Sequence, residues 1–74
     1  MRKNFTKDER AALVEGTAVE WRNVSHWLTA VITGPITDDG MGYQTVPIRS
    51  TQATRTVGKG EELFAYPGKV RVAN

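Results

Sequence analysis

Apolar and polar residues follow a helical spacing at the start of the chain and an alternating one afterwards. Thr6 is followed three residues later by Glu9, which is the capping-box spacing of a helix N-terminus. Leu13 and Val14 are expected to face the rest of the domain. The pattern therefore predicts a short helix over about residues 6–15, which must dock on the remaining chain because it is too short to be stable alone.

The rest of the chain alternates between apolar and polar residues, as expected for strands with one buried face. Such runs are rich in Val, Ile, Thr and aromatic residues and are separated by turn residues. Pro47 lies inside one of them and indicates an edge position or a bulge, because proline cannot donate to a β-ladder. The predicted strands cover residues 17–22, 26–33, 43–49, 53–57, 62–66 and 69–72.

Turn residues predict how these strands are connected. Gly34-Pro35 should break the second strand or form a bulge in it. Residues 37–42 should form a loop because they contain Asp-Gly and two close glycines. Pro67-Gly68 fits the central positions of a type II turn. With 74 residues there is little room for a two-sheet sandwich, so we expect one domain over residues 1–74 whose strands form a small barrel over about residues 17–73.

The segment of residues 19–32 resembles the opening hairpin of SH3-like barrels, especially Tudor and Tudor-like domains. The resemblance rests on Trp27, with a small residue, Ala30, three positions later and a β-branched residue, Ile32, five positions later. Ala30 and Ile32 should point into the barrel, whereas Trp27 should lie on the opposite face. The resemblance implies a mostly-β, SH3-like barrel of five or six antiparallel strands after a short N-terminal α-helix, which binds ligands through loops at its mouth.

Composition argues against catalysis and metal binding. The chain has no cysteine and one histidine, His26, so thiolate chemistry is excluded and no zinc-ligand spacing is present. We expect neither an enzyme nor a cofactor. There is no apolar run of the roughly 20 residues needed to span a bilayer and no signal-peptide pattern, so we expect a cytoplasmic protein without membrane contact.

Charge is distributed unevenly but is not dense. The net charge is +2, with basic residues concentrated in residues 1–10 and 43–74 and acidic ones between them. A dedicated nucleic-acid binder usually has a denser basic stripe. The simplest interpretation is a solvated surface of mixed sign.

Aromatic residues are the remaining candidates for binding. Trp21 and one of Phe64 or Tyr66 are expected in the core, because a small domain needs their buried area. For Trp27 two alternatives stay open, a position beneath the helix against Leu13 or an exposed platform for a ligand. The predicted partner-binding residues are Trp27, Tyr43 and Tyr66 with Arg49 or Arg55 nearby.

Three functions are compatible with this pattern. The leading hypothesis is an adaptor or inhibitor that docks on a larger protein partner. The sequence is also similar in style to the compact open reading frames of actinobacteria and their phages, which would imply a phage-encoded, host-modifying role. The alternatives are nucleic-acid binding through the basic C-terminal half and self-assembly through an open strand edge, so the chain is expected to be a monomer or a weak homo-oligomer.

Overall fold

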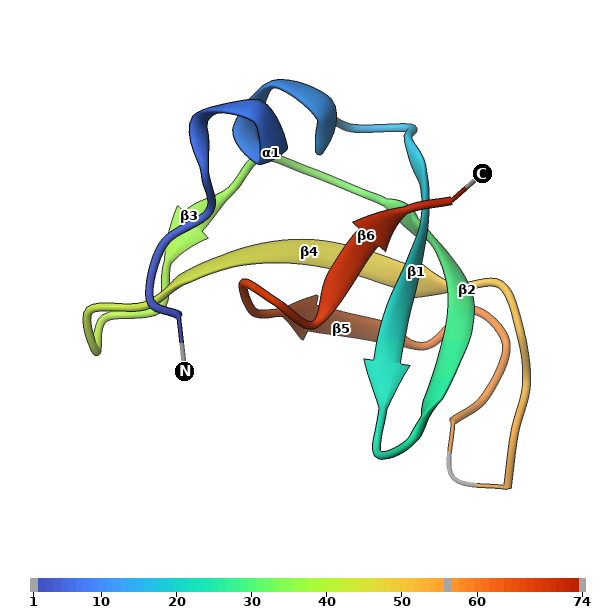
Figure 1. The fold of residues 1–74 in the computed structure, drawn as a ribbon. Helices are drawn as coiled ribbons and strands as arrows, with labels where there is room; N and C mark the ends of the chain where they lie inside the picture. The colour runs from blue at the N-terminus through green and yellow to red at the C-terminus, as the bar shows by residue number, and fades with distance from the viewer. Residues whose placement is uncertain (1, 56, 74) are drawn as a thin grey trace.

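The computed structural model describes residues 2–55 and 57–73, and it shows one short helix beside six antiparallel strands curled into a half-barrel (Figure 1). The mostly-β prediction is therefore confirmed. The elements are α1 (Lys7–Ala12), β1 (Ala18–Asn23), β2 (His26–Ile32), β3 (Thr37–Asp38), β4 (Gln44–Ser50), β5 (Glu62–Ala65) and β6 (Val70–Val72).

Helix α1 begins as predicted but ends early. The Thr6 side chain accepts a hydrogen bond from Glu9 N, and the Glu9 carboxylate accepts one from Thr6 N, so the capping box is complete. The helix ends at Ala12 rather than near residue 15, because Leu13 leaves helical geometry with a ψ of 69°. Leu13 is buried, whereas Val14 is 52% exposed, so the expectation that Val14 faces the domain is wrong.

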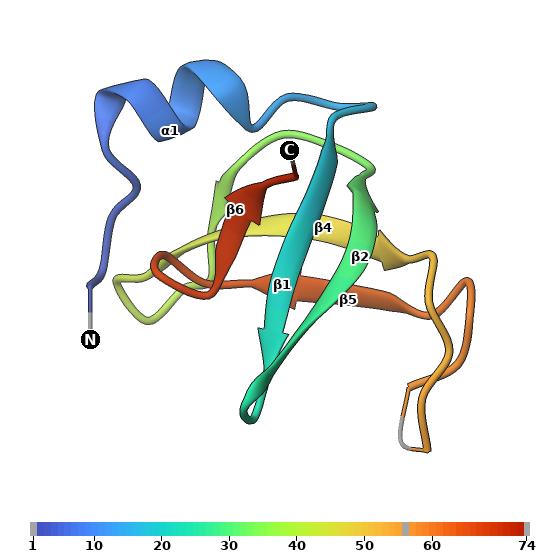
Figure 2. The ribbon, with the colours of Figure 1, turned by 45° about the vertical axis from the view of Figure 1, so that its right-hand side comes forward.

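The sheet is open, and its last strand lies beside its first. Its order is β3-β4-β2-β1-β6, and β5 pairs with β4 on the side opposite β2. The hairpin of β1 and β2 runs from the Ala18↔Val31 pair to Asn23↔His26, and β6 returns to lie beside β1. Figures 1 and 2 show β1, β2 and β6 in front of β4 and β5, so that the sheet bends around one interior.

Three strand predictions need correction. The predicted strand at 53–57 is wrong: its described residues 53–55 and 57 have no strand geometry, and Thr56 lies outside the described residues. The predicted loop at 37–42 contains the two-residue strand β3. Pro47 is not in an edge strand, because β4 pairs with β5 on one side and with β2 and β3 on the other. It lies where the register on the second side shifts by two residues, between the pairs Ile32↔Ile48 and Thr37↔Thr45.

Pro47 is tolerated in this interior strand because of where the ladder ends. The pairing of β2 with β4 stops at Ile32↔Ile48, so the proline nitrogen lies beyond the last pair. The carbonyl of Pro47 still accepts a hydrogen bond from Thr33 N at 3.0 Å. The Pro67-Gly68 turn forms as predicted, with Gly68 at φ 84° and Lys69 N donating to Tyr66 O at 3.0 Å.

The core lies on the concave side of the sheet. Ala30 and Ile32 point into it, as predicted, and Trp21 packs against it from its margin. Neither Phe64 nor Tyr66 is a core residue. Phe5 fills that role instead, since the segment before α1 returns to the sheet and Phe5 N donates to Gln44 Oε1 at 2.8 Å. The buried cluster contains Phe5, Leu13, Val19, Ala30, Ile32, Val46, Ile48, Ala65 and Val70.

Candidate functional site

Strands β4 and β5 carry an aromatic surface on the side away from the core. Val46 pairs with Ala65 and is buried, so alternation places the neighbouring pair Pro47↔Phe64 on the opposite face. Phe64 is 67% exposed. Together with the pair Arg49↔Glu62 and the tyrosines that flank the strands, this makes one surface, called here the β4–β5 outer surface. It consists of Tyr43, Pro47, Arg49, Glu62, Phe64 and Tyr66.

Two tyrosines form the end of this surface. The rings of Tyr43 and Tyr66 meet edge to face with centroids 6.0 Å apart and an interplanar angle of 80°. This is a favoured geometry for aromatic pairs, because the positive edge of one ring meets the negative face of the other. Both rings are half-buried, so the pair is fixed yet still reaches solvent.

Asp39 holds the tyrosine pair in place. Its Oδ1 accepts hydrogen bonds from Met41 N at 2.7 Å and Tyr43 N at 3.1 Å, and its Oδ2 accepts one from the Tyr66 hydroxyl at 3.2 Å. The bond from Met41 N, followed by those from Tyr43 N and the Tyr66 hydroxyl, lowers the pKa of the Asp39 carboxyl. The same contact raises the pKa of the Tyr66 hydroxyl. The loop after β3 is therefore bound directly to the end of β5.

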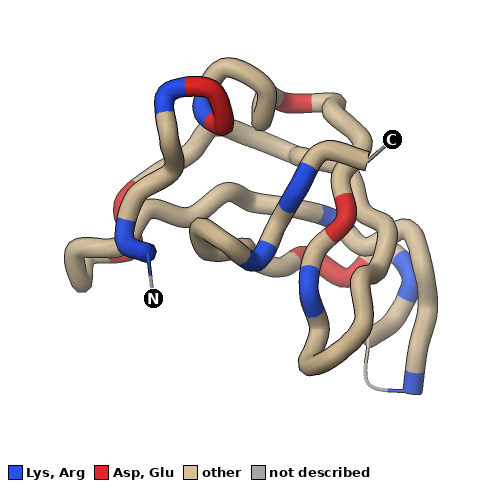
Figure 3. The backbone as a smooth tube through the Cα atoms, in the orientation of Figure 1, with Lys and Arg blue, Asp and Glu red and all other residues tan. Residues whose placement is uncertain are grey.

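The rim of the surface carries both signs of charge. The Lys3 ammonium lies 5.7 Å from the centroid of the Tyr43 ring, and the Asp39 carboxylate accepts a hydrogen bond from the Tyr66 hydroxyl. Arg49 and Glu62 face each other across β4 and β5 and are exposed. In Figure 3 strand β1 carries both an acidic and a basic position, and the neighbouring strand β6 carries a basic one.

Trp27 belongs to a different group. It lies on the outer face of β2, opposite Arg22, and the Arg71 guanidinium stacks on its ring at 3.8 Å from the centroid. Arg71 Nε also pairs with Glu20 Oε1 at 2.9 Å. The alternative in which Trp27 covers Leu13 beneath the helix is wrong, because Leu13 packs into the core on the opposite side of the sheet.

Arg55 is not brought near the tyrosine pair. It is exposed in the loop segment of residues 51–55, beside a shallow hollow of about 310 Å³ that is also lined by Val24 and His26 of the β1–β2 hairpin. Figures 1 and 2 both place this loop at the opposite end of the molecule from the β3–β4 loop. Of the predicted residues, the structure unites Tyr43, Tyr66 and Arg49 on one surface and leaves Trp27 and Arg55 elsewhere.

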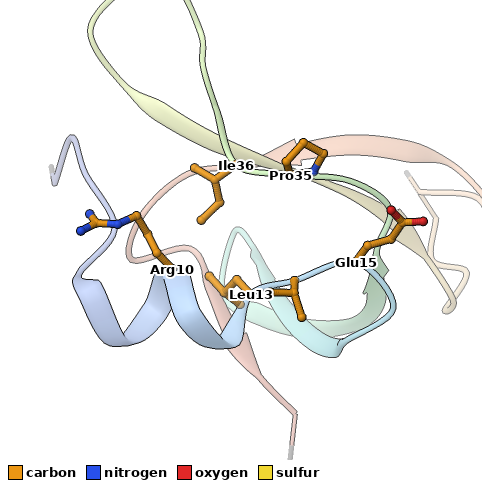
Figure 4. A pocket seen from close by; sticks show the side chains of 6 residues that line it. Arg10, Leu13, Glu15, Pro35 and Ile36 are labelled. Atoms are coloured by element: carbon orange, nitrogen blue, oxygen red, sulfur yellow. The ribbon is translucent and has the colours of Figure 1, made fainter.

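A second hollow lies between the end of α1 and the segment after β2 (Figure 4). Its volume is about 320 Å³. Leu13 and Ile36 point toward one another across it, and Arg10 and Glu15 stand at its two ends. Arg10 is already engaged, since its Nη1 donates to Phe5 O at 2.7 Å. This hollow lies where the end of α1 packs against the segment that follows β2.

Comparison with protein-family models, with curated proteins and with solved structures found no match to this chain. Within residues 2–55 and 57–73, no three His, Cys, Asp or Glu side chains gather as a metal site. Nor does the described part of the chain contain a helix with the length and hydrophobicity needed to cross a membrane. The geometry of the site itself must therefore carry any functional proposal.

Sequence reasoning missed Phe64, Asp39 and Arg71. The signal for Phe64 was present, because it stands between Leu63 and Ala65, and alternation directs it outward once these two face the core. Asp39 and Arg71 gave no comparable signal. Their partners, Tyr66 and Trp27, are distant in the sequence, and only the fold brings each pair together.

Proposed function

We propose that this chain is a non-catalytic binding module that docks on a larger protein partner through the β4–β5 outer surface. The observation that carries the proposal is Phe64, which is 67% exposed beside Pro47 and in line with the tyrosine pair. Large apolar side chains on a monomer surface mark interaction sites when they are contiguous and rimmed by polar groups. Aromatic residues are also the commonest anchors of protein interfaces.

The proposed fold of this module is an SH3-like barrel. The hairpin of β1 and β2 supports it, because Ala30 and Ile32 face the core and Trp27 faces outward, as in the resemblance that predicted the barrel. Pairing of β6 with β1, which brings the last strand beside the first, also supports it. A role in modifying a host protein belongs to the same proposal, since such a role needs a docking surface and no catalytic group.

The test compares two exposed apolar residues. Phe64→Ser removes the anchor, and Val24→Thr changes a residue that is 88% exposed in the β1–β2 turn, outside the proposed surface. Wild type and both variants are used to capture proteins from the source cell, and affinities for the purified partner are measured by calorimetry. We expect Phe64→Ser to weaken binding about tenfold or more, as for an interface anchor, and Val24→Thr to bind like wild type. Equal binding by all three proteins would refute the proposed surface.

Nucleic-acid binding is the alternative function, and the Trp27 group favours it. Trp27 lies opposite Arg22 on the outer face, and the Arg71 guanidinium stacks on its ring. A base that took the place of the guanidinium could stack on Trp27 while the arginines met phosphates. Titration of Trp fluorescence with single-stranded oligonucleotides separates the two functions. Nucleic-acid affinity should fall steeply with salt, whereas docking through Phe64 should barely respond. Absence of oligonucleotide binding at low salt would eliminate the alternative.

A further inference from the structure

Strand β5 is an open edge of the sheet. Among the described residues it pairs with β4 alone, and Figures 1 and 2 show no strand beyond it. The strand at the other edge, β6, has a neighbour, because α1 and β6 together line a groove of about 250 Å³. An uncovered edge is a template for pairing with another strand.

Hydrogen-bond direction shows which residues of β5 face the open side. Ser50 of β4 donates its N–H to Glu61 O at 2.9 Å, so the backbone groups of Glu61 point toward β4. In an antiparallel ladder this direction alternates from one residue to the next. The backbone groups of Glu62 and Phe64 therefore point away from β4, and these are the groups that an added strand would bond.

We infer that the strand that pairs with β5 is β5 of a second copy of this chain. With the twofold axis at Phe64, the two Phe64 side chains lie opposite each other on the outer face, and Glu62 of each copy lies opposite Tyr66 of the other. An axis at Glu62 would oppose two carboxylates, and an axis at Leu63 would oppose Glu62 to Phe64. Aromatic pairs across strands are favourable and opposed like charges are not. An axis at Ala65 would also oppose aromatic side chains, Phe64 to Tyr66, but its ladder would run into Pro67 and form fewer hydrogen-bonded pairs. The register centred on Phe64 is therefore selected.

This pairing is isologous and short. A twofold axis makes the same residues meet on both copies, so the assembly closes as a dimer. It spans residues 62–66 and stops at Pro67, which cannot donate to a ladder. So few pairs bury less than the roughly 1,200 Å² of a stable interface. The dimer is consequently weak and depends on protein concentration.

The inference rests on the proposed function, because Phe64 belongs to both surfaces, but the two are measured separately. Sedimentation velocity of the wild type from about 10 µM to about 1 mM covers the range of weak association. We expect the mass to rise from 8.2 kDa toward twice that value. A wild type that stays at 8.2 kDa throughout overturns the dimer and leaves partner capture through Phe64 untouched.

Engineered cysteines test the register, since the chain has none of its own. Hydrogen-bonded partners in an antiparallel pair have Cα atoms about 5.5 Å apart, within the range of a disulfide. Under a mild oxidant, Phe64→Cys should give a covalent dimer, whereas the control Glu62→Cys, at another exposed position of β5, should not. A dimer of Glu62→Cys but not of Phe64→Cys would overturn the register.

A variant with a blocked edge tests whether the dimer forms through β5. Glu62→Pro removes an N–H that faces the open side and leaves Phe64 in place. We expect it to stay folded by circular dichroism and to remain monomeric at about 1 mM. If Glu62→Pro is folded and dimerises like wild type, pairing through β5 is wrong.

Discussion

Val24 occupies a backbone conformation that suits glycine better than a β-branched residue. Its φ is 59°, in the two-residue turn between Asn23 and His26, and it is the described non-glycine residue with a positive φ. A Cβ in this region collides with the following carbonyl oxygen. The side chain is 88% exposed, so it gains little from packing to offset the strain.

Replacing Val24 with glycine should therefore stabilise the protein. The relief of about 1–2 kcal/mol is partly offset by the flexibility of glycine in the unfolded chain, about 0.5–1 kcal/mol. We expect a net gain of up to about 1 kcal/mol in urea unfolding, and a smaller gain for Val24→Ala, which keeps the Cβ. A glycine variant less stable than the wild type would contradict this account.

Helix α1 is held by the residues on either side of it. None of its residues from Lys7 to Ala12 is buried, whereas Phe5 before it and Leu13 after it are both in the core. The capping box fixes where the helix begins, and the two flanking side chains fix where it lies. Such a short helix would not persist without these contacts.

The contrast between Leu13 and Val14 tests this view. Leu13 is 3% exposed, so Leu13→Ala should cost about 2–5 kcal/mol by leaving a cavity. Val14 is 52% exposed, and Val14→Ala should change stability by no more than about 0.5 kcal/mol. Chemical unfolding monitored by Trp fluorescence measures both. Similar losses for the two variants would mean that the helix continues past Leu13 in solution.

Two carboxylates, Glu9 and Asp39, bind residues from other parts of the chain and should make the stability of the whole molecule depend on pH in the acidic range. Glu9 is bonded to Arg2 and to Thr6 N, and these contacts lower its pKa, the Arg2 contact most strongly. Asp39 has a lowered pKa because of Met41 N, Tyr43 N and Tyr66. Each carboxylate therefore releases its proton at lower pH when folded than when unfolded.

The sign of the pH dependence follows from this difference. The unfolded chain binds these protons near the ordinary carboxyl pKa of about 4, so stability is full above that value and is lost as the pH falls through the lower folded values. Urea midpoints measured from neutral pH downward should show this loss. Asp39→Asn should reduce the loss, and Tyr66→Phe should reduce it less, because backbone N–H groups are the main cause. An unchanged acid slope in Asp39→Asn would contradict the assignment.

Local features of this chain were predictable from its residues. The capping box of Thr6 and Glu9, the Pro67-Gly68 turn and the inward direction of Ala30 and Ile32 depend on neighbours within a few positions. A helix cap, a turn and the two faces of a strand are set by short-range geometry, so spacing alone specifies them. The aromatic character of the site was likewise visible in advance.

Long-range pairing decided the rest. Pro47 can lie in an interior strand because the pairing of β4 with β2 ends at the neighbouring residue, Ile48. Phe5 takes the place expected for Phe64 in the core because the N-terminal segment packs against β4. The candidate surface likewise depends on the pairing of β4 with β5. The open edge at β5 depends on the position of α1, which lies beside β6 at the other edge. Alternation along a strand assigns each side chain to one of two faces of the sheet. Whether that face is buried depends on which other segments the fold packs against it.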